Sequence, residues 1–237
     1  MFPVRLKVVM LCAFFFLLFS VVSSVSARSG SIPLLAVTEG SGAGLVAELE
    51  LSVVSGSGEV FLNTYPLTKL STQLSLRVAV DQACQELLVD CSKSDFMFTI
   101  RAPPGIVGGP SAGGAAAVLT AEVVGNLSRK YSSIVMTGTI NTGGVIGPVG
   151  GYEEKIQAAA RQGFKTVLVP KGALRGSNFS VNATVNITEV GTLRDVLERW
   201  YVYSPIVDSQ TLLLSTSYAE AMRSVAEDLC KTVDDEI

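Results

Sequence analysis

The sequence predicts an α/β fold, with one main domain and a further helix that follows at the C-terminus. Segments of strand composition alternate along the chain with segments whose apolar residues recur at helical spacing. Hydrophobic residues make up 48% of the 237 residues and charged residues only 16%, which is ample material for one core. The alternation continues without an internal repeat or a long linker, so one main domain is expected.

The first half of the expected fold consists mainly of strands. Residues 33–62 have strand composition, and from Lys69 to about Leu88 the apolar residues recur at mainly helical spacing without Gly or Pro. Residues 95–100 return to strand composition. The sequence Pro103-Pro104-Gly105 then predicts a loop, because proline and glycine interrupt regular structure.

The second half begins with a helix from Ser111 to about Val124 that is apolar on nearly every side, which is typical of a buried helix. A short strand at 133–136 and a glycine-rich hairpin lead to a second helix over 151–162. The remaining expected elements are strands at 166–169 and 183–188, a helix at 192–200 and a final helix at 209–233.

The N-terminus predicts export from the cytoplasm. Arg5 and Lys7 precede an uncharged apolar run over residues 8–22, and small residues follow up to Ala27. These are the three regions of a secretory signal. The run is shorter than the roughly 20 residues of a comfortable membrane span, which favours cleavage near Ala27. A retained signal anchor, holding the protein at the membrane through residues 8–22, is the alternative.

Both alternatives place the rest of the chain outside the cytoplasm, either secreted or anchored to the outer face of the membrane. We therefore expect a signal peptide or anchor at 1–27, a folded domain at 28–203 and a helical extension at 204–237. Four glycosylation sequons agree with export, and three of them cluster between residues 178 and 188. A net charge of −3 without a basic block argues against nucleic acid as a partner.

Two cysteines are close in sequence and lie outside the signal segment. Cys84 and Cys91 can form a disulfide around the end of a helix in an exported protein, and two ordinary buried side chains are the alternative. We predict the disulfide. Neither a histidine nor a further cysteine pair completes a zinc site, so we expect no metal and no cofactor.

A glycine-rich turn over residues 108–114 places one hydroxyl, that of Ser111, at the start of the apolar helix. Gly109, Pro110 and Ala112 surround it. Glycines let the backbone approach a substrate carbonyl closely, and amides at a helix start can bind an oxyanion. The chain contains no histidine, which excludes a Ser–His–Asp triad and leaves a lysine as the base for such a serine.

Lys155 is the candidate base, one turn after Gly150-Gly151 and near the start of the second helix. Burial and the partial positive charge of a helix N-terminus both lower the pKa of a lysine. The alanines at 158–160 supply apolar surface for burial. Glu153 and Glu154 act in the opposite direction, so the mechanism requires both to point to solvent. A serine that caps a helix and a solvated lysine are the alternative interpretation of these segments.

Four separated blocks of the chain resemble, in order and spacing, the proteolytic domain of the Lon family. They are Gly109–Gly113, Met136–Gly138, Gly147–Ile156 and Lys165–Pro170. The resemblance covers most of residues 33–200 and implies a Lon protease-domain-like α+β fold, in which small mixed sheets are packed by helices. It also implies a polypeptide substrate. It also implies that Ser111 is the nucleophile and Lys155 the base, with Thr137 positioning the lysine amine by hydrogen bonding.

The chain also departs from the family's pattern. Lon proteases often carry an acidic residue just ahead of the Gly-Pro-Ser block, where this chain has Gly108, and some carry histidines on the preceding strand. A Lon protease has an ATPase module, whereas these residues contain no Gly-x-x-x-x-Gly-Lys-Ser/Thr loop. By layout the chain is similar to stand-alone, exported Lon-like proteins of archaea. The tendency of Lon protease domains to form rings implies a homo-oligomer.

These observations predict an ATP-independent, extracytoplasmic serine endopeptidase that uses a Ser–Lys dyad on flexible or unfolded polypeptides. Two alternatives stay open: a catalytically weak or inactive Lon-like binding or assembly module at the cell surface, and a non-peptide acyl hydrolase with the same dyad. The intact Ser111, Thr137 and Lys155 favour an active enzyme over a decayed one. Nothing in the sequence separates a peptidase from an acyl hydrolase.

Overall fold

The structure, a computed structural model, describes residues 27–38, 42–65, 68–102, 108–175, 185–205, 220–225 and 227. The chain divides into two compact units, Met1–Pro205 and Ile206–Ile237. The signal segment, the sequons at 178 and 182 and most of the expected final helix lie outside the described residues, although residues 220–225 are helical. In the part of the chain that is described, no helix combines the length and apolar character needed to cross a membrane.

A four-stranded sheet with the strand order β1-β2-β4-β3 forms one layer of the first unit. Its strands are β1 (Arg28–Val37), β2 (Gly44–Ser55), β3 (Val60–Tyr65) and β4 (Ser94–Arg101). The β1–β2 and β2–β4 pairs are antiparallel, whereas β3 and β4 are parallel. A parallel pair needs a crossover connection, and the helix α2 (Leu70–Glu86) provides it.

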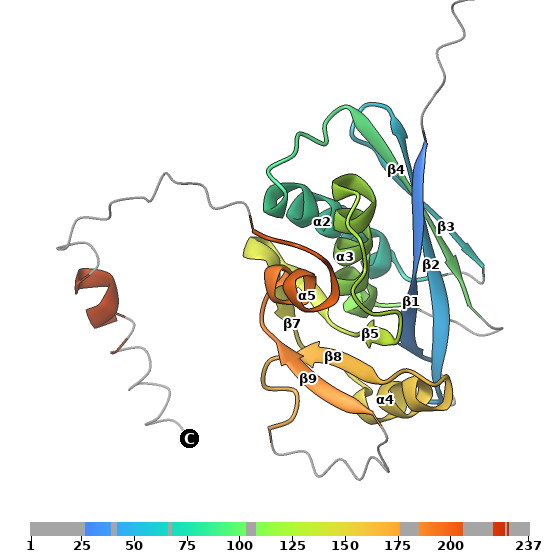
Figure 1. Cartoon of the computed structure of the whole chain (residues 1–237), viewed down its shortest axis with the longest axis vertical. Helices are drawn as coiled ribbons and strands as arrows, with labels where there is room; N and C mark the ends of the chain where they lie inside the picture. The colour runs from blue at the N-terminus through green and yellow to red at the C-terminus, as the bar shows by residue number, and fades with distance from the viewer. Residues whose placement is uncertain are drawn as a thin grey trace, which may run out of the picture. The chain divides into compact units, whose positions relative to one another are not determined.

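Helix α2 and helix α3 (Gly113–Gly125) lie on one face of this sheet (Figure 1). A short 3₁₀ helix, η1 (Pro110–Ala112), leads directly into α3. Most residues of α3 are buried, because the helix packs against β1 and β2 on one side and against α2 and α5 (Leu193–Trp200) on others. The prediction of a buried apolar helix is confirmed.

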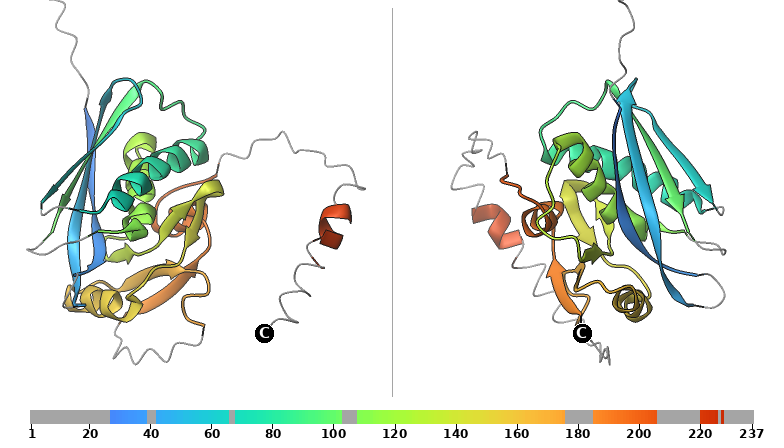
Figure 2. Two further views of the ribbon diagram at one scale, coloured as in Figure 1. Left: turned by 180° about the vertical axis from the view of Figure 1, so that it is seen from behind. Right: turned by 45° about the vertical axis from the view of Figure 1, so that its right-hand side comes forward.

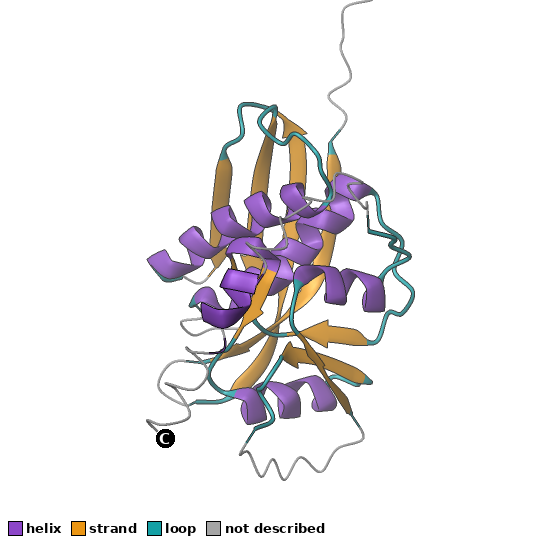
Figure 3. Cartoon of the chain, turned by 90° about the vertical axis from the view of Figure 1, so that its left-hand side faces the viewer, coloured by secondary structure: helices purple, strands orange, loops and turns teal. Residues whose placement is uncertain are grey.

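Two smaller sheets complete the first unit (Figure 2). Their strands are β5 (Ile134–Met136), β8 (Thr166–Pro170) and β9 (Asn186–Val190) in a parallel sheet, and β6 (Thr139–Asn141) and β7 (Val145–Gly147) in an antiparallel hairpin. Helix α4 (Tyr152–Arg161) packs against β1 and β2. Figure 3 shows the helices α2 and α3 in front of the large sheet and α4 beyond its end. The predicted mixed α/β class is confirmed.

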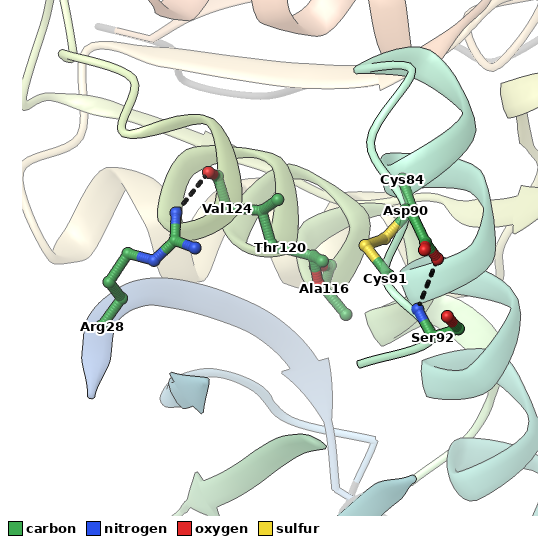
Figure 4. Close-up of a disulfide and its surroundings, with 8 residues drawn as sticks. All are labelled: Arg28, Cys84, Asp90, Cys91, Ser92, Ala116, Thr120 and Val124. Atoms are coloured by element: carbon green, nitrogen blue, oxygen red, sulfur yellow. Dashed lines mark hydrogen bonds between the residues drawn. A yellow bond between two sulfur atoms is a disulfide. The ribbon is translucent and has the colours of Figure 1, made fainter. Parts of the chain in front are cut away.

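A disulfide joins Cys84, near the end of α2, to Cys91, in the loop before β4 (Figure 4). The two Cα atoms are 6.2 Å apart. The pairing predicted from the sequence is therefore confirmed, and it ties the end of α2 to the start of the next strand.

On the neighbouring helix α3, the buried Thr120 donates a hydrogen bond from Oγ1 to the carbonyl of Ala116 at 2.8 Å.

Candidate active site

Ser111 and Lys155, from segments far apart in the sequence, line one cavity of about 370 Å³. The other residues that line it are Val37, Lys69, Ser71, Gly108, Gly109, Pro110, Thr139, Pro148, Val149 and Gly150. The charged side chains in this set are two lysines, and it contains no carboxylate. Within the described ranges, no group of three or more His, Cys, Asp or Glu side chains is placed to hold a metal ion.

The half-buried Ser111 is the middle residue of η1, directly before α3. Gly109 precedes this short helix with φ 129° and ψ 171°, a conformation that residues with a side chain rarely adopt. A β-carbon at this position would meet no atom within 4 Å. The backbone dihedral, and not a lack of space, is thus the reason for a glycine two residues before the candidate nucleophile.

Gly108 stands where the family resemblance leads us to expect an acidic residue, and the structure leaves no room for one. A β-carbon here would lie 2.7 Å from Oγ1 of Thr68 and 2.8 Å from the backbone nitrogen of Lys69. Such contacts are closer than atoms can approach without a shift of the backbone. The turn before Ser111 therefore packs directly against the start of α2, in place of an acidic side chain.

Thr72, in the first turn of α2, holds this turn through its side chain and was not singled out by the sequence. It is only 1% exposed, and its Oγ1 accepts a hydrogen bond from the amide of Gly109 at 2.9 Å. Oγ1 also lies 3.0 Å from Oγ1 of Thr68. A threonine near a helix start usually bonds its own helix, and this contact spans 37 residues, so no local pattern could reveal it.

Lys155 is buried on α4, with only 3% of its surface exposed. Its Nζ donates a hydrogen bond to the carbonyl of Gly150 at 2.8 Å. Burial lowers its pKa from the ordinary 10.5 to about 8, and the negative charge of Glu154 partly offsets that decrease. The low pKa expected from the sequence is present, but burial rather than the helix N-terminus is its main cause.

The two glutamates beside Lys155 do not pair with its amine. Glu154 is exposed, and Glu153 accepts a hydrogen bond from Nε2 of Gln157 at 3.2 Å. Among the described residues no hydrogen bond joins Nζ of Lys155 to Oγ of Ser111. In unliganded active sites the distance between base and nucleophile is often long and shortens only when substrate binds. The structure brings the two groups to one cavity, and among the described residues no carboxylate pairs with the amine.

Thr137 lies between β5 and β6, where its amide donates to the carbonyl of Leu168 at 3.0 Å. The side chain is 1% exposed, and its Oγ1 has no hydrogen-bond partner within the described residues. It is not among the residues that line the cavity. A buried hydroxyl without a partner is rare because it costs about 1–3 kcal/mol, so such a group calls for an explanation.

Residues 22–202 match the model of the Lon protease (S16) C-terminal proteolytic domain. The Lon protease of Roseiflexus castenholzii is 33% identical over 180 residues, which are 71% of this chain and 22% of that protein. The Lon protease of Paraburkholderia phytofirmans is 36% identical over 127 residues, or 52% of this chain and 16% of that protein.

A plant protein, the peroxisomal Lon protease homolog 2 of Spinacia oleracea, is 34% identical over 142 residues, or 56% of this chain and 16% of its own length. The chain thus spans between about a sixth and a quarter of the length of these relatives. The family model, in contrast, matches well over half of the chain, from residue 22 to residue 202. By its sequence, its fold and this match, the chain belongs to the family of the Lon protease C-terminal proteolytic domain, a family of serine peptidases.

Proposed function

We propose that this chain is a serine endopeptidase that cleaves flexible or unfolded polypeptides with a Ser111–Lys155 dyad, without ATP and outside the cytoplasm. One observation carries the proposal. In a chain without histidine, the serine and a buried lysine whose pKa is lowered to about 8 line the same cavity. A neutral amine is what a serine needs as its base, and burial provides it near neutral pH.

The first half of the reaction forms an acyl-enzyme. The neutral Nζ of Lys155 takes the proton from Oγ of Ser111 while Oγ bonds to the carbonyl carbon of the peptide. The peptide C–N bond then breaks, and the departing nitrogen receives the proton from Nζ. In the second half a water gives one proton to Nζ while its oxygen bonds to the acyl carbon. The bond between that carbon and Oγ then breaks, and Nζ returns the proton to Oγ of Ser111.

The negative oxygen that forms during each half-reaction needs hydrogen-bond donors at the turn around Ser111. Some surrounding amides already have acceptors, namely those of Gly109, Gly113 and Gly114. Pro110 has no N–H. We assign the oxyanion site to the amide of Ser111, because the first N–H groups of a helix lack acceptors within it.

Independence from ATP and the choice of an unfolded substrate belong to the same proposal. The 237 residues contain no phosphate-binding loop of the Walker type, so they supply no nucleotide site that could drive unfolding. A cavity of about 370 Å³ accepts a few side chains and not a folded domain. The substrate must therefore present an extended segment.

The location outside the cytoplasm is proposed on two grounds. Residues 5–27 have the composition of a secretory signal, and the Cys84–Cys91 disulfide is of the kind that persists in oxidising compartments. N-terminal sequencing of protein recovered from cells tests this part. We expect a chain that begins near residue 28. An intact N-terminus in the membrane fraction would support the anchor alternative, and a cytoplasmic chain that begins at Met1 would contradict export.

The activity is tested by incubating the purified protein with an unfolded protein substrate, with and without ATP, beside Ser111→Ala. We expect cleavage by the wild type that does not depend on ATP, and none by the variant. Equal cleavage by both would exclude Ser111 as nucleophile. Hydrolysis of small esters without cleavage of polypeptide would instead support the acyl hydrolase alternative, and no turnover of either would support the binding module.

A further inference from the structure

We infer that Thr72 is a positioning residue for this reaction, which rests on the function proposed above. Its hydroxyl fixes the turn at Gly109 and thereby sets the geometry of Ser111, both of its side chain and of its oxyanion-binding amide. Thr72 has no role in the proton transfer itself. It acts through the backbone of the turn that carries the nucleophile.

The first ground for this inference is that the hydroxyl of Thr72 contacts the turn before Ser111 directly. Oγ1 of Thr72 lies 2.9 Å from the nitrogen and 3.4 Å from the oxygen of Gly109, so it contacts both polar atoms of that residue. The Oγ1 of Thr68, 3.0 Å away, completes its surroundings. Thr72 is only 1% exposed, and its hydroxyl bonds to a residue far away in the sequence and does not cap α2.

The second ground is that, among the described residues, the amide of Gly109 donates its hydrogen bond to Thr72 and to no other group. Glycine reaches φ 129° at low cost, but for the same reason it can leave that region easily. No atom lies within 4 Å of the position that a β-carbon would take, so no packing restrains the residue on that side. The bond from its amide to Thr72 is the directional contact that remains.

The third ground is that α2 is a suitable support. Ser75 Oγ donates to the carbonyl of Thr72 at 2.8 Å, which fixes the first turn of the helix. Further along α2, the buried Gln82 accepts the amide of Gly144 at 2.7 Å and so holds the β6–β7 hairpin that carries Thr139 to the cavity. The helix thus positions two separate parts of the cavity wall.

The test compares Thr72→Val, which keeps the shape of the side chain but removes the hydroxyl, with Thr72→Ser, which keeps the hydroxyl. Thr120→Val is the matched control, because Thr120 is an equally buried helical threonine whose hydroxyl bonds only within α3. The readouts are kcat and KM on an unfolded substrate and the thermal midpoint of unfolding. Ser111→Ala is assayed in parallel.

We expect Thr72→Val to lower kcat by roughly 10- to 100-fold with little change in KM, because a misplaced nucleophile and oxyanion site slow chemistry more than binding. Thr72→Ser should recover most of kcat. Thr120→Val should lower the thermal midpoint about as much as Thr72→Val but leave kcat unchanged. If Thr72→Val does not fold, Thr72→Ala replaces it, since alanine also lacks the hydroxyl and favours helix.

Two results would overturn the inference while leaving the proposed function intact: wild-type kcat in Thr72→Val, or an equal loss of kcat in Thr72→Val and Thr120→Val. A loss of kcat in Thr72→Ser as large as in Thr72→Val would also contradict it, because the hydroxyl would then not be the group that matters. Failure of the proposed function has a different signature, namely that Ser111→Ala still cleaves the substrate.

Discussion

Lys155 donates from Nζ to the carbonyl oxygen of Gly150 at 2.8 Å, and both residues line the cavity that holds Ser111. A carbonyl accepts a hydrogen bond from a protonated and from a neutral amine alike. The contact therefore fixes the position of the amine without supplying a charge that would keep it protonated. Burial alone then moves its pKa downward.

The first prediction concerns the dependence of activity on pH. Since the pKa of Lys155 is lowered to about 8, kcat/KM should rise about tenfold per pH unit at acidic pH and level off above about pH 8. Glu154→Gln should move the midpoint to lower pH, because the charge of Glu154 raises that pKa. Glu153→Gln, which removes a carboxylate bonded to Gln157, is the matched control. A rate that does not change between pH 6 and 9 would contradict the assignment.

The second prediction is that Lys155→Met loses activity but gains stability. Turnover should fall about as far as in Ser111→Ala, because partners in one proton transfer are not additive. The decrease in pKa from 10.5 to about 8 corresponds to about 3 kcal/mol of unfavourable burial at neutral pH, which methionine avoids.

The second prediction also states how the difference in stability between Lys155→Met and the wild type depends on pH. The folded state binds fewer protons than the unfolded state between about pH 8 and 10.5, so the wild type gains stability there and the advantage of the variant shrinks. Urea unfolding at pH 7 and pH 10 measures both effects. Near-normal cleavage by Lys155→Met would leave the chain without an assigned base.

The third prediction concerns Thr137, whose buried Oγ1 has no hydrogen-bond partner within the described residues. Replacing it by valine removes an unsatisfied polar atom and keeps the shape, so stability should stay equal or rise by about 1 kcal/mol. If the hydroxyl positions the amine of Lys155 during the reaction, kcat should nevertheless fall by about tenfold. Unchanged kcat together with higher stability would show that the hydroxyl takes no part.

The fourth prediction concerns Gly109. Gly109→Ala adds a methyl group that meets no atom within 4 Å, so its effect comes only from the strained φ of 129°. The turn should relax and kcat should fall by roughly 10-fold or more, with a loss of stability of about 1–2 kcal/mol. Gly163→Ala is a matched control, since Gly163 also has φ above zero and open space around it but lies after α4. Equal kcat in the two variants would contradict the prediction.

The fifth prediction concerns the disulfide. The double variant Cys84→Ser, Cys91→Ser should lose about 2 kcal/mol of stability, as expected for a bridge across a sequence separation of 7 residues. Reducing agent should lower the midpoint of the wild type to the same value and leave that of the variant unchanged. Mass spectrometry of protein from cells, without reduction, should find the linked peptide. Two freely alkylated thiols would contradict it.

The parts of the fold that the sequence predicted are those that local patterns determine. The buried helix α3 was evident from its apolar residues on every side, and β8 from a short apolar run before Pro170. The Cys84–Cys91 disulfide was predicted from the closeness of the two cysteines in sequence, the expected export and the lack of further metal ligands. The order of the strands in the sheet could not be predicted from local patterns. The parallel pairing of β3 with β4 depends on contacts between segments that are separated in sequence by α2.

In the candidate site, too, local sequence patterns could be used for prediction and long-range contacts could not. Ser111 and Lys155 could be found because glycine-rich turns mark both, whereas the hydrogen bond of Thr72 to Gly109 joins residues 37 apart and leaves no local trace. The cause of the low pKa of Lys155 was only partly foreseen. A helix N-terminus is visible in a sequence, but the depth of burial that dominates here depends on how α4 packs against β1 and β2.

The burial of Lys155 also has a consequence for the protein before it is folded. In an unfolded chain a lysine keeps its ordinary pKa of about 10.4 and is fully protonated at neutral pH, so it cannot accept the proton of a serine. The proposed base comes into existence only when α4 has docked and removed the amine from water. Completion of folding is then the activation step, and under the proposed export a chain that is still crossing the membrane carries these residues without their reactivity.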